Sequence, residues 1–309
     1  MQSCLASGLA VAGFPDTEPK ENPLKLASFI HAGQPRYGQV LAERFLLPPA
    51  DFLARHPDLL SVLRAQALGE LEQALQAGAV SVDAAQTQAL PVIPNPGKLI
   101  CVGLNYKTHV AETRRADSEH PSLFLRFNDS LAADGDELLR PAFSERFDWE
   151  GELAFVIGRG GRHIAKEDAF DHIAGYACFN DVSVRDWQRH THQFTPGKNF
   201  PGTAPFGPWL VTRDEVADVR SLALQTRLNG SVMQQASLGD LIFDIPTIVA
   251  YVSRFTPLSP GDVIATGTPG GVGDRREPPL YMKHGDVVEV EITGLGVLRN
   301  RIGTDSAAV

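Results

Sequence analysis

The sequence predicts an α+β protein that is mainly β, with a small N-terminal α/β domain followed by a larger β domain. Two observations support the β assignment: short apolar runs bounded by Gly and Pro recur irregularly after about residue 97, and long helical patterns are few there. A third feature is a Pro-Asn-Pro-Gly stretch at 94–97, which separates a part with both strand and helix patterns from a part with mostly strand patterns. We therefore expect domains at 1–94 and 95–309.

The N-terminal part predicts two strands and one helix. The apolar segment 24–30 is typical of a strand, and residues 33–38 resemble a turn that leads into a second strand. Apolar residues then recur every four positions from Leu59 to Leu75, and the pattern ends at Gly78. Such a stripe indicates a helix that packs one face on a neighbour. No catalytic cluster is visible in this part.

The second part predicts a series of strands and one clear helix at 247–255. The expected strands are 98–102, 153–157, 209–212, 263–265 and 287–292. With so few helices between them, we expect a mostly antiparallel sheet structure.

Composition excludes several classes of partner. The chain has 309 residues, with 28 Lys and Arg against 37 Asp and Glu, so its net charge is −9 and no nucleic-acid or anionic-membrane partner is expected. Cys4, Cys101 and Cys178 are too far apart for a disulfide framework, which favours a reducing compartment, and we expect the cytoplasm. No apolar run approaches the roughly 18–20 residues of a transmembrane helix. The apolar start of the chain has no preceding Lys or Arg, so no signal peptide is expected.

Two Glu-x-Glu pairs occur in different surroundings. Glu289 and Glu291 alternate with apolar residues, which is typical of a half-buried strand whose acids face water. Glu150 and Glu152 instead enter an unbroken apolar run, and their spacing places both carboxylates on one side of a buried strand. Adjacent buried carboxylates are unfavourable unless a cation neutralises them, so either Mg²⁺ or Mn²⁺ or a salt-bridge network is expected here. We choose Asp181 as the third acidic ligand.

Other sequence signals indicate local packing more than chemistry. The glycines at 158–161 and 267–273 do not complete a dinucleotide or Walker A motif. Gly270 and Gly271 predict close backbone approach to a wall or a ligand. His190 and His192 could share one face of a strand, but their polar neighbours favour a solvated loop.

The residues after about 97 resemble the fumarylacetoacetate hydrolase superfamily. The resemblance covers residues 97–303 and depends on several motifs in order. They are Gly-Leu-Asn-Tyr at 103–106, Glu150-x-Glu152, Asn-Asp-Val-Ser-x-Arg-Asp-x-Gln at 180–188, Gly-Lys-Asn-Phe at 197–200, Asn-Gly at 229–230 with Gln234, Gly-Thr-Pro-Gly-Gly-Val-Gly at 267–273, Gly-Asp-Val at 285–287 and Gly-Leu-Gly at 294–296. The family implies a β-sandwich roll catalytic domain, usually a homodimer, that holds Mg²⁺ or Mn²⁺ and acts on 2-oxo acids.

Two residues outside the acid cluster are candidates for proton transfer. His109 and Glu112 are three residues apart, so they would share one face if the segment is helical. Such a pair is also common on surface helices. The resemblance matches it to a catalytic dyad on a mobile lid helix, for which Gly103 would suit a hinge.

The resemblance also implies ligands for the substrate. Lys198 matches a catalytic lysine that stabilises an enolate or an oxyanion near the metal. Arg185 and Gln188 follow Asp181 by four and seven residues and match clamps for carboxylate and carbonyl groups. Thr268 matches a contact to the substrate carboxylate.

Two departures from the family pattern concern the substrate. Arg126 stands where family members commonly carry a lysine, and its planar fork differs from a point donor. We expect it to bind substrate. Pro201 stands where the family often has aspartate. The walls that select the acyl group are expected around Arg114 and Arg115 and along 186–201.

The predicted function is metal-dependent hydrolysis of a carbon–carbon bond in a 2,4-dioxo acid of the acylpyruvate or fumarylpyruvate type. In this hypothesis His109, oriented by Glu112, activates water, and Lys198 stabilises the oxyanion. Pyruvate and a carboxylic acid are the products. Decarboxylation, isomerisation or hydration of a 2-oxo acid at the same metal site is the alternative, and a non-catalytic ligand-binding protein is the third.

Overall fold

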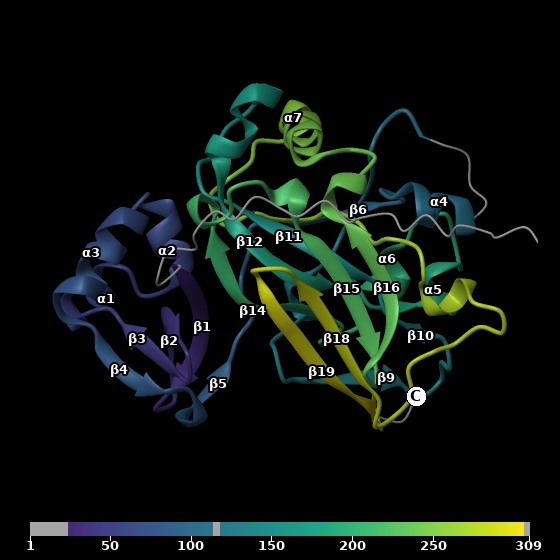
Figure 1. Ribbon diagram of the computed structural model, residues 1–309, viewed down its shortest axis with the longest axis horizontal. Helices are drawn as coiled ribbons and strands as arrows, with labels where there is room; N and C mark the ends of the chain where they lie inside the picture. Colours follow the sequence, from purple (N-terminus) through teal and green to yellow (C-terminus); the bar gives the residue numbers. More distant parts are fainter. Residues whose placement is uncertain (1–23, 114–117, 306–309) are drawn as a thin grey trace, which may run out of the picture.

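The computed structural model describes residues 24–113 and 118–305, and Cys4, Arg114 and Arg115 lie outside these ranges. The N-terminal strands and helices lie on one side of the molecule, and the larger β structure lies on the other (Figure 1). The chain is mainly β with several helices, as predicted.

One large sheet runs through both parts of the chain. Its strands, in spatial order, are β4 (Val80–Asp83), β3 (Arg44–Leu47), β2 (Gln34–Leu41), β1 (Lys25–His31), β14 (Ala204–Thr212), β12 (Ile173–Asn180), β11 (Gly151–Ile157), β17 (Val263–Ala265), β6 (Leu99–Gly103) and β7 (Ser122–Leu125). Two further strands join it, β5 (Thr87–Ala89) on β1 and β8 (Leu131–Ala132) on β14. Lys25 of β1 lies opposite Val211 of β14, so the sheet continues across the predicted boundary at 94–97.

A smaller sheet packs on the large one. Its strands, in spatial order, are β16 (Ser231–Ser237), β15 (Ala223–Leu228), β18 (Val287–Ile292), β19 (Gly296–Asp305) and β9 (Glu137–Pro141). A separate pair joins β10 (Phe147–Asp148) to β13 (Ser183–Val184). Among the described pairs, only β17–β6, β14–β8 and β19–β9 are parallel. The mostly antiparallel prediction is therefore confirmed.

Helices are short in the described part of the chain. They are α1 (Ala50–Arg55), α2 (Leu59–Arg64), α3 (Leu68–Gly78), α4 (Lys107–Thr113), α5 (Arg185–Gln188), α6 (Thr195–Lys198) and α7 (Ile245–Phe255). Figure 1 shows α1, α2 and α3 beside the N-terminal strands, and α4, α5 and α6 at the opposite side of the molecule.

Strand β11 is buried on both faces because two different layers cover it. Leu153 and Phe155 pack in the core between the two sheets. Ala154 and Val156 point the other way and join the core beneath α2 and α3. Burying each of the large side chains contributes about 1.5–3 kcal/mol, so the apolar run fixes this strand at the centre of the protein. Its first residues then hold Glu150 and Glu152 in a fixed place.

Three local expectations differ from the structure. The predicted helix 59–78 is two helices, because Gln66 adopts a positive φ of 56° that ends the first. The predicted turn at 33–38 is shorter, since Ala32 and Gly33 alone make a two-residue turn and β2 begins at Gln34. Glu289 does not face water; it is buried and pairs with arginines of the neighbouring strands.

Candidate functional site

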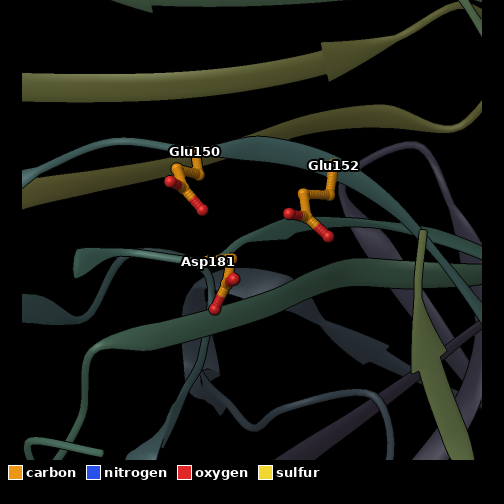
Figure 2. A group of neighbouring side chains, drawn as sticks. All are labelled: Glu150, Glu152 and Asp181. Carbon is orange, nitrogen blue, oxygen red and sulfur yellow. The ribbon is translucent and has the colours of Figure 1, made fainter. Parts of the chain in front are cut away.

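The three predicted metal ligands lie together at one end of β11. Glu150 and Glu152 flank the first residue of this strand, and Asp181 directly follows the antiparallel strand β12. Because Gly151 pairs with Asn180, the start of one strand lies beside the end of the other, and residues far apart in the sequence meet. The three carboxylates are buried, with ligand atoms within 4.8 Å of one another (Figure 2).

Backbone hydrogen bonds fix this meeting point. The Asp181 amide donates to the Glu150 carbonyl at 2.8 Å, and the Glu150 amide donates to the side-chain oxygen of Asn180 at 3.0 Å. The Gly151 amide donates to Gln234 on β16 at 3.0 Å, which ties the site to the smaller sheet. The carboxylates are thus carried by rigid strands.

Cationic side chains surround two of the three acids. Lys198 Nζ donates to Glu150 Oε2 and to Asp181 Oδ2, both at 2.6 Å, and to the Asp181 carbonyl at 2.9 Å. Arg126 Nε donates to Asp181 Oδ1 at 2.5 Å. Arg185 Nη1 lies 2.7 Å from Glu150 Oε1. Glu152, in contrast, accepts a backbone hydrogen bond from Gly267 at 2.8 Å and has no ion pair among the described residues.

For this reason the pKa values of Glu150 and Glu152 shift in opposite directions. Burial alone would raise the pKa of Glu150, but Arg185 and Lys198 outweigh it and hold the pKa well below its usual range. Burial, followed by the charges of Asp181 and Glu150, raises the pKa of Glu152 well above its usual value. The group therefore lacks positive charge at Glu152. Three converging carboxylates with such a deficit fit a hard divalent cation.

This charge deficit predicts how metal affects stability. We expect Mg²⁺ or Mn²⁺ to raise the melting temperature of the wild type and to leave that of Glu152→Gln nearly unchanged. A ligand that binds only the folded state stabilises it by about 2.7 kcal/mol at a concentration of 100 Kd. Thermal unfolding with and without Mn²⁺ measures the effect. Glu289→Gln, which alters an ion-paired acid of β18, is the control and should keep the full shift. An equal shift in both variants would remove Glu152 from the ligand set.

The predicted proton-transfer pair is formed on helix α4. His109 Nδ1 lies 2.7 Å from Glu112 Oε1, and His109 is buried. The other oxygen of Glu112 accepts from the Gly271 amide at 2.9 Å, while Thr108 accepts from Gly270 at 3.1 Å. These hydrogen bonds therefore hold the glycine-rich loop after β17 against α4. Because Glu112 contacts Nδ1 of His109, the second ring nitrogen, Nε2, takes no part in the pair.

Glycine is required where this loop passes its neighbours. Gly271 has a φ of +104°, and an added Cβ would lie 2.3 Å from the Met233 carbonyl of β16. At Gly270 the nearest atom is in Thr108, at 3.1 Å from such a Cβ. The close backbone contacts predicted for Gly270 and Gly271 are thus with other residues of the protein, Thr108 and Met233.

One cavity of about 310 Å³ joins these groups. It is lined by the acid triad and by His109, Arg185, Gln188, Lys198 and Thr268. His192 of the predicted polar loop also lines it, as do several other residues of the 186–201 stretch. His190 instead packs on Trp187 and is not among the residues that line this cavity.

The predicted substrate clamps have distinct contacts. Arg185 Nε donates to Asp148 at 2.8 Å and its Nη1 to Gln188 at 3.0 Å. Its Nη2 is buried and has no hydrogen-bond partner among the described residues. Buried donors are nearly always paired, so this nitrogen is available to an anionic ligand. Thr268 is held by Gly151 and Gln234.

Two predicted residues are placed differently from their expected roles. Arg126 does not line the cavity; it lies behind Asp181 and bonds Asp181, Val182 and Thr203. Its contacts indicate a residue that positions the Asp181 carboxylate. Lys198 faces the cavity, but each of its three N–H groups donates a hydrogen bond to a protein oxygen. No N–H group of Lys198 is therefore left to bind an oxyanion in this arrangement.

Asp148 is a site residue that our sequence reasoning missed. It is completely buried, and it accepts from Arg185 and from the amides of Gly273 and Asp274. Burial raises the pKa of this carboxyl, although Arg185 opposes the rise. A signal was present, because Asp148 has the same period-two spacing as Glu150 and Glu152.

A β sandwich with a buried carboxylate triad beside a His–Glu pair defines a candidate metal-dependent enzyme. The chain belongs to the fumarylacetoacetate hydrolase family: the family model described as fumarylacetoacetate (FAA) hydrolase C-terminal matches residues 98–303.

Several proteins whose names state different activities are similar to this chain. The mitochondrial oxaloacetate tautomerase fahd2 of Xenopus laevis is 40% identical over 240 residues, covering 75% of each protein. The structure of fumarylacetoacetate hydrolase from Exiguobacterium antarcticum is 34% identical, with a TM-score of 0.81, covering 91% of this chain and all of that one. Maleylpyruvate hydrolase from Sphingobium sp. SYK-6, solved with manganese(II) and pyruvate, is 29% identical, with a TM-score of 0.75 and coverage of 92% and 100%. These relatives share one family, and their names state different reactions.

Between residues 24 and 113 and between 118 and 305, no helix has the length and apolar character needed to cross a membrane.

Proposed function

We propose that the protein is a divalent-cation-dependent keto–enol tautomerase that acts on an oxaloacetate-like 2-oxo acid. The observation that carries this proposal is that His109, which Glu112 holds at 2.7 Å, lines the same cavity as the acid triad. A base that faces a cation site is the minimum needed to move a proton next to a carbonyl group.

The triad of Glu150, Glu152 and Asp181 would hold Mg²⁺ or Mn²⁺, both of which prefer oxygen ligands. The bound cation would supply a Lewis acid that withdraws electron density from the 2-oxo group. Arg185 Nη2 supports binding of the adjacent carboxylate, since this buried donor lacks a partner among the described residues. Gln188 and Thr268 line the same space and would orient the substrate.

His109 carries the proposed proton transfer. Its Nδ1 faces Glu112, so its Nε2 is the atom that takes a proton from C3 of the keto form. The C–H electron pair then forms the C2–C3 double bond, the π electron pair of the C2–O bond moves to oxygen, and that oxygen takes up the proton that His109 Nε2 holds. Glu112 stabilises the protonated ring while the proton is held. No atom is gained or lost, and the reverse sequence turns enol into ketone.

Lys198 favours this reaction over hydrolysis. Its three N–H groups bond Glu150 and Asp181, so its contacts support a role in balancing the charge of the triad. Tautomerisation needs no further oxyanion donor at C4, whereas the hydrolytic hypothesis assigns that task to Lys198. The identity of 40% to an oxaloacetate tautomerase points the same way.

Hydrolysis of a carbon–carbon bond in a 2,4-dioxo acid is the second candidate. It is supported by the likeness to a maleylpyruvate hydrolase, whose structure holds manganese(II) and pyruvate. In this reaction His109 would take a proton from water instead of from carbon. Decarboxylation, isomerisation and hydration use the same site and are further outcomes of the test.

The test is a substrate panel followed with Mg²⁺ and with EDTA. We expect the enol absorbance of freshly dissolved oxaloacetate to decay faster with the Mg²⁺-loaded protein, and EDTA to abolish the acceleration. Pyruvate and a free acid from acylpyruvates, with no effect on oxaloacetate enol, would favour the hydrolase. Carbon dioxide would favour a decarboxylase, turnover of an unsaturated 2-oxo acid an isomerase or hydratase, and no turnover at all a ligand-binding protein.

Three further proposals come from the sequence and family. We propose a homodimer, a cytoplasmic location and a division into domains at 1–94 and 95–309. The described cysteines, Cys101 and Cys178, are free and buried, in keeping with a reducing compartment. The name of the Xenopus relative places that protein in mitochondria.

A further inference from the structure

A second group of charged side chains lies on the wall of the same cavity, apart from the acid triad. Arg189 follows α5, and Asp274 and Arg275 belong to the short 3₁₀ turn Gly273–Arg275. All three line the cavity. Arg189 Nη2 donates to Asp274 Oδ2, and Arg275 Nε lies 3.4 Å from the same oxygen.

This group carries more positive than negative charge. Two guanidinium groups share one carboxylate, and the other oxygen of Asp274 accepts from Tyr281 at 2.9 Å. The side chain of Asp274 is only 4% exposed, whereas those of Arg189 and Arg275 are 43% and 35% exposed. Asp274 therefore holds the arginines in place, and one unit of positive charge faces the cavity without a counter-charge in the group.

Asp148 connects this outer group to the inner end of the cavity. Its Oδ2 accepts from Arg185 Nε at 2.8 Å and from the Asp274 amide at 2.9 Å. Its Oδ1 accepts from the Gly273 amide at 2.8 Å. One buried carboxylate thus fixes both Arg185, beside the triad, and the turn that carries Arg275. The separation between the two cationic ends is set by the fold.

We infer that Arg189 and Arg275 form a second anion-binding end of the cavity, which selects dicarboxylic 2-oxo acids by binding their distal carboxylate. The 2-oxo carboxylate of such an acid lies at the triad and Arg185, and its distal carboxylate lies against the outer guanidinium groups. A substrate with an uncharged acyl group would leave the outer positive charge unpaired. This inference rests on the proposed function for the inner end only.

Binding of stable and reactive 2-oxo acids tests the inference without requiring turnover. Isothermal titration of the Mg²⁺-loaded protein compares oxaloacetate, 2-oxoglutarate and 2-oxoadipate with analogues in which an isopropyl group replaces the distal carboxylate. Pyruvate reports on the inner end alone. We expect at least one dicarboxylic acid to bind about tenfold more tightly than its analogue, as hydrogen bonds to charged groups contribute about 1.5–3 kcal/mol.

Arg275→Gln should remove most of this tenfold preference while the Kd of pyruvate changes less than twofold. Arg189→Gln should act in the same direction. Arg55→Gln removes one exposed arginine on α1, outside the cavity lining, and should preserve the preference. The inference is overturned if no dicarboxylic acid is preferred, or if Arg275→Gln weakens pyruvate and the dicarboxylic acids equally. Loss of the proposed tautomerase activity alone would leave these titrations unaffected, so the two failures are distinguishable.

Discussion

Replacement of His109 by glutamine is expected to lower kcat for oxaloacetate tautomerisation by about 10²–10⁴-fold, the usual contribution of a positioned general base. His109 lies in the cavity with the triad, but within the described part of the chain it makes no hydrogen bond to a carboxylate of the triad. The Mn²⁺-induced rise in melting temperature should therefore stay as in the wild type. Stopped-flow decay of the enol absorbance and thermal unfolding measure the two effects on the same preparation.

Two variants separate catalysis from packing in this experiment. Glu112→Gln removes the charge that stabilises the protonated ring, so its kcat should lie between those of the wild type and His109→Gln. His172→Gln removes another buried histidine, which bonds Arg159 outside the cavity, and should leave kcat unchanged. Wild-type turnover in His109→Gln would show that another group moves the proton.

The sheet structure was predictable wherever the strands are continuous apolar runs. The expected strand 153–157 lies within β11, and the expected strand 263–265 coincides with β17. Burial on both faces requires such runs, so composition alone reveals them. The break at Gln66 was not predictable from periodicity, because the apolar stripe continues through it: Leu63, Ala67 and Leu71 are all buried. A single positive φ divides the helix while its apolar face stays in register with the core.

The acid triad was predictable because strand periodicity fixes the side on which Glu150 and Glu152 lie. Asp181 was chosen from its local sequence, and the His109–Glu112 pair from its spacing together with the family resemblance; the structure brings both to the cavity or its wall. The sequence motifs could not show in which direction the side chains of Arg126 and Lys198 point. Each is a long side chain whose partners come from distant segments, such as Asp181, which lies 55 residues from Arg126.

The largest stability effect is expected for Lys198→Met, measured without metal. Lys198 is almost fully buried and bridges Glu150 and Asp181, both at 2.6 Å. Removing one partner of a buried ion pair costs about 3–5 kcal/mol, because the other partner stays buried without its counter-charge. We therefore expect the free energy of unfolding to fall by about this amount, reduced to the extent that Arg126 and Arg185 still balance the acids. Urea unfolding in the presence of EDTA measures it.

Metal should recover most of this loss, and this recovery identifies the role of the lysine. A divalent cation bound by the triad replaces the missing positive charge, so Mn²⁺ should stabilise Lys198→Met more than it stabilises the wild type. Lys98→Met is the matched control: Lys98 bonds the buried carboxylate of Asp262 at 2.8 Å, outside the cavity lining, so its loss should be destabilising but insensitive to Mn²⁺. If Mn²⁺ stabilises Lys198→Met no more than the wild type, the lysine does not balance the charge of the triad, and its assignment as an oxyanion donor regains support.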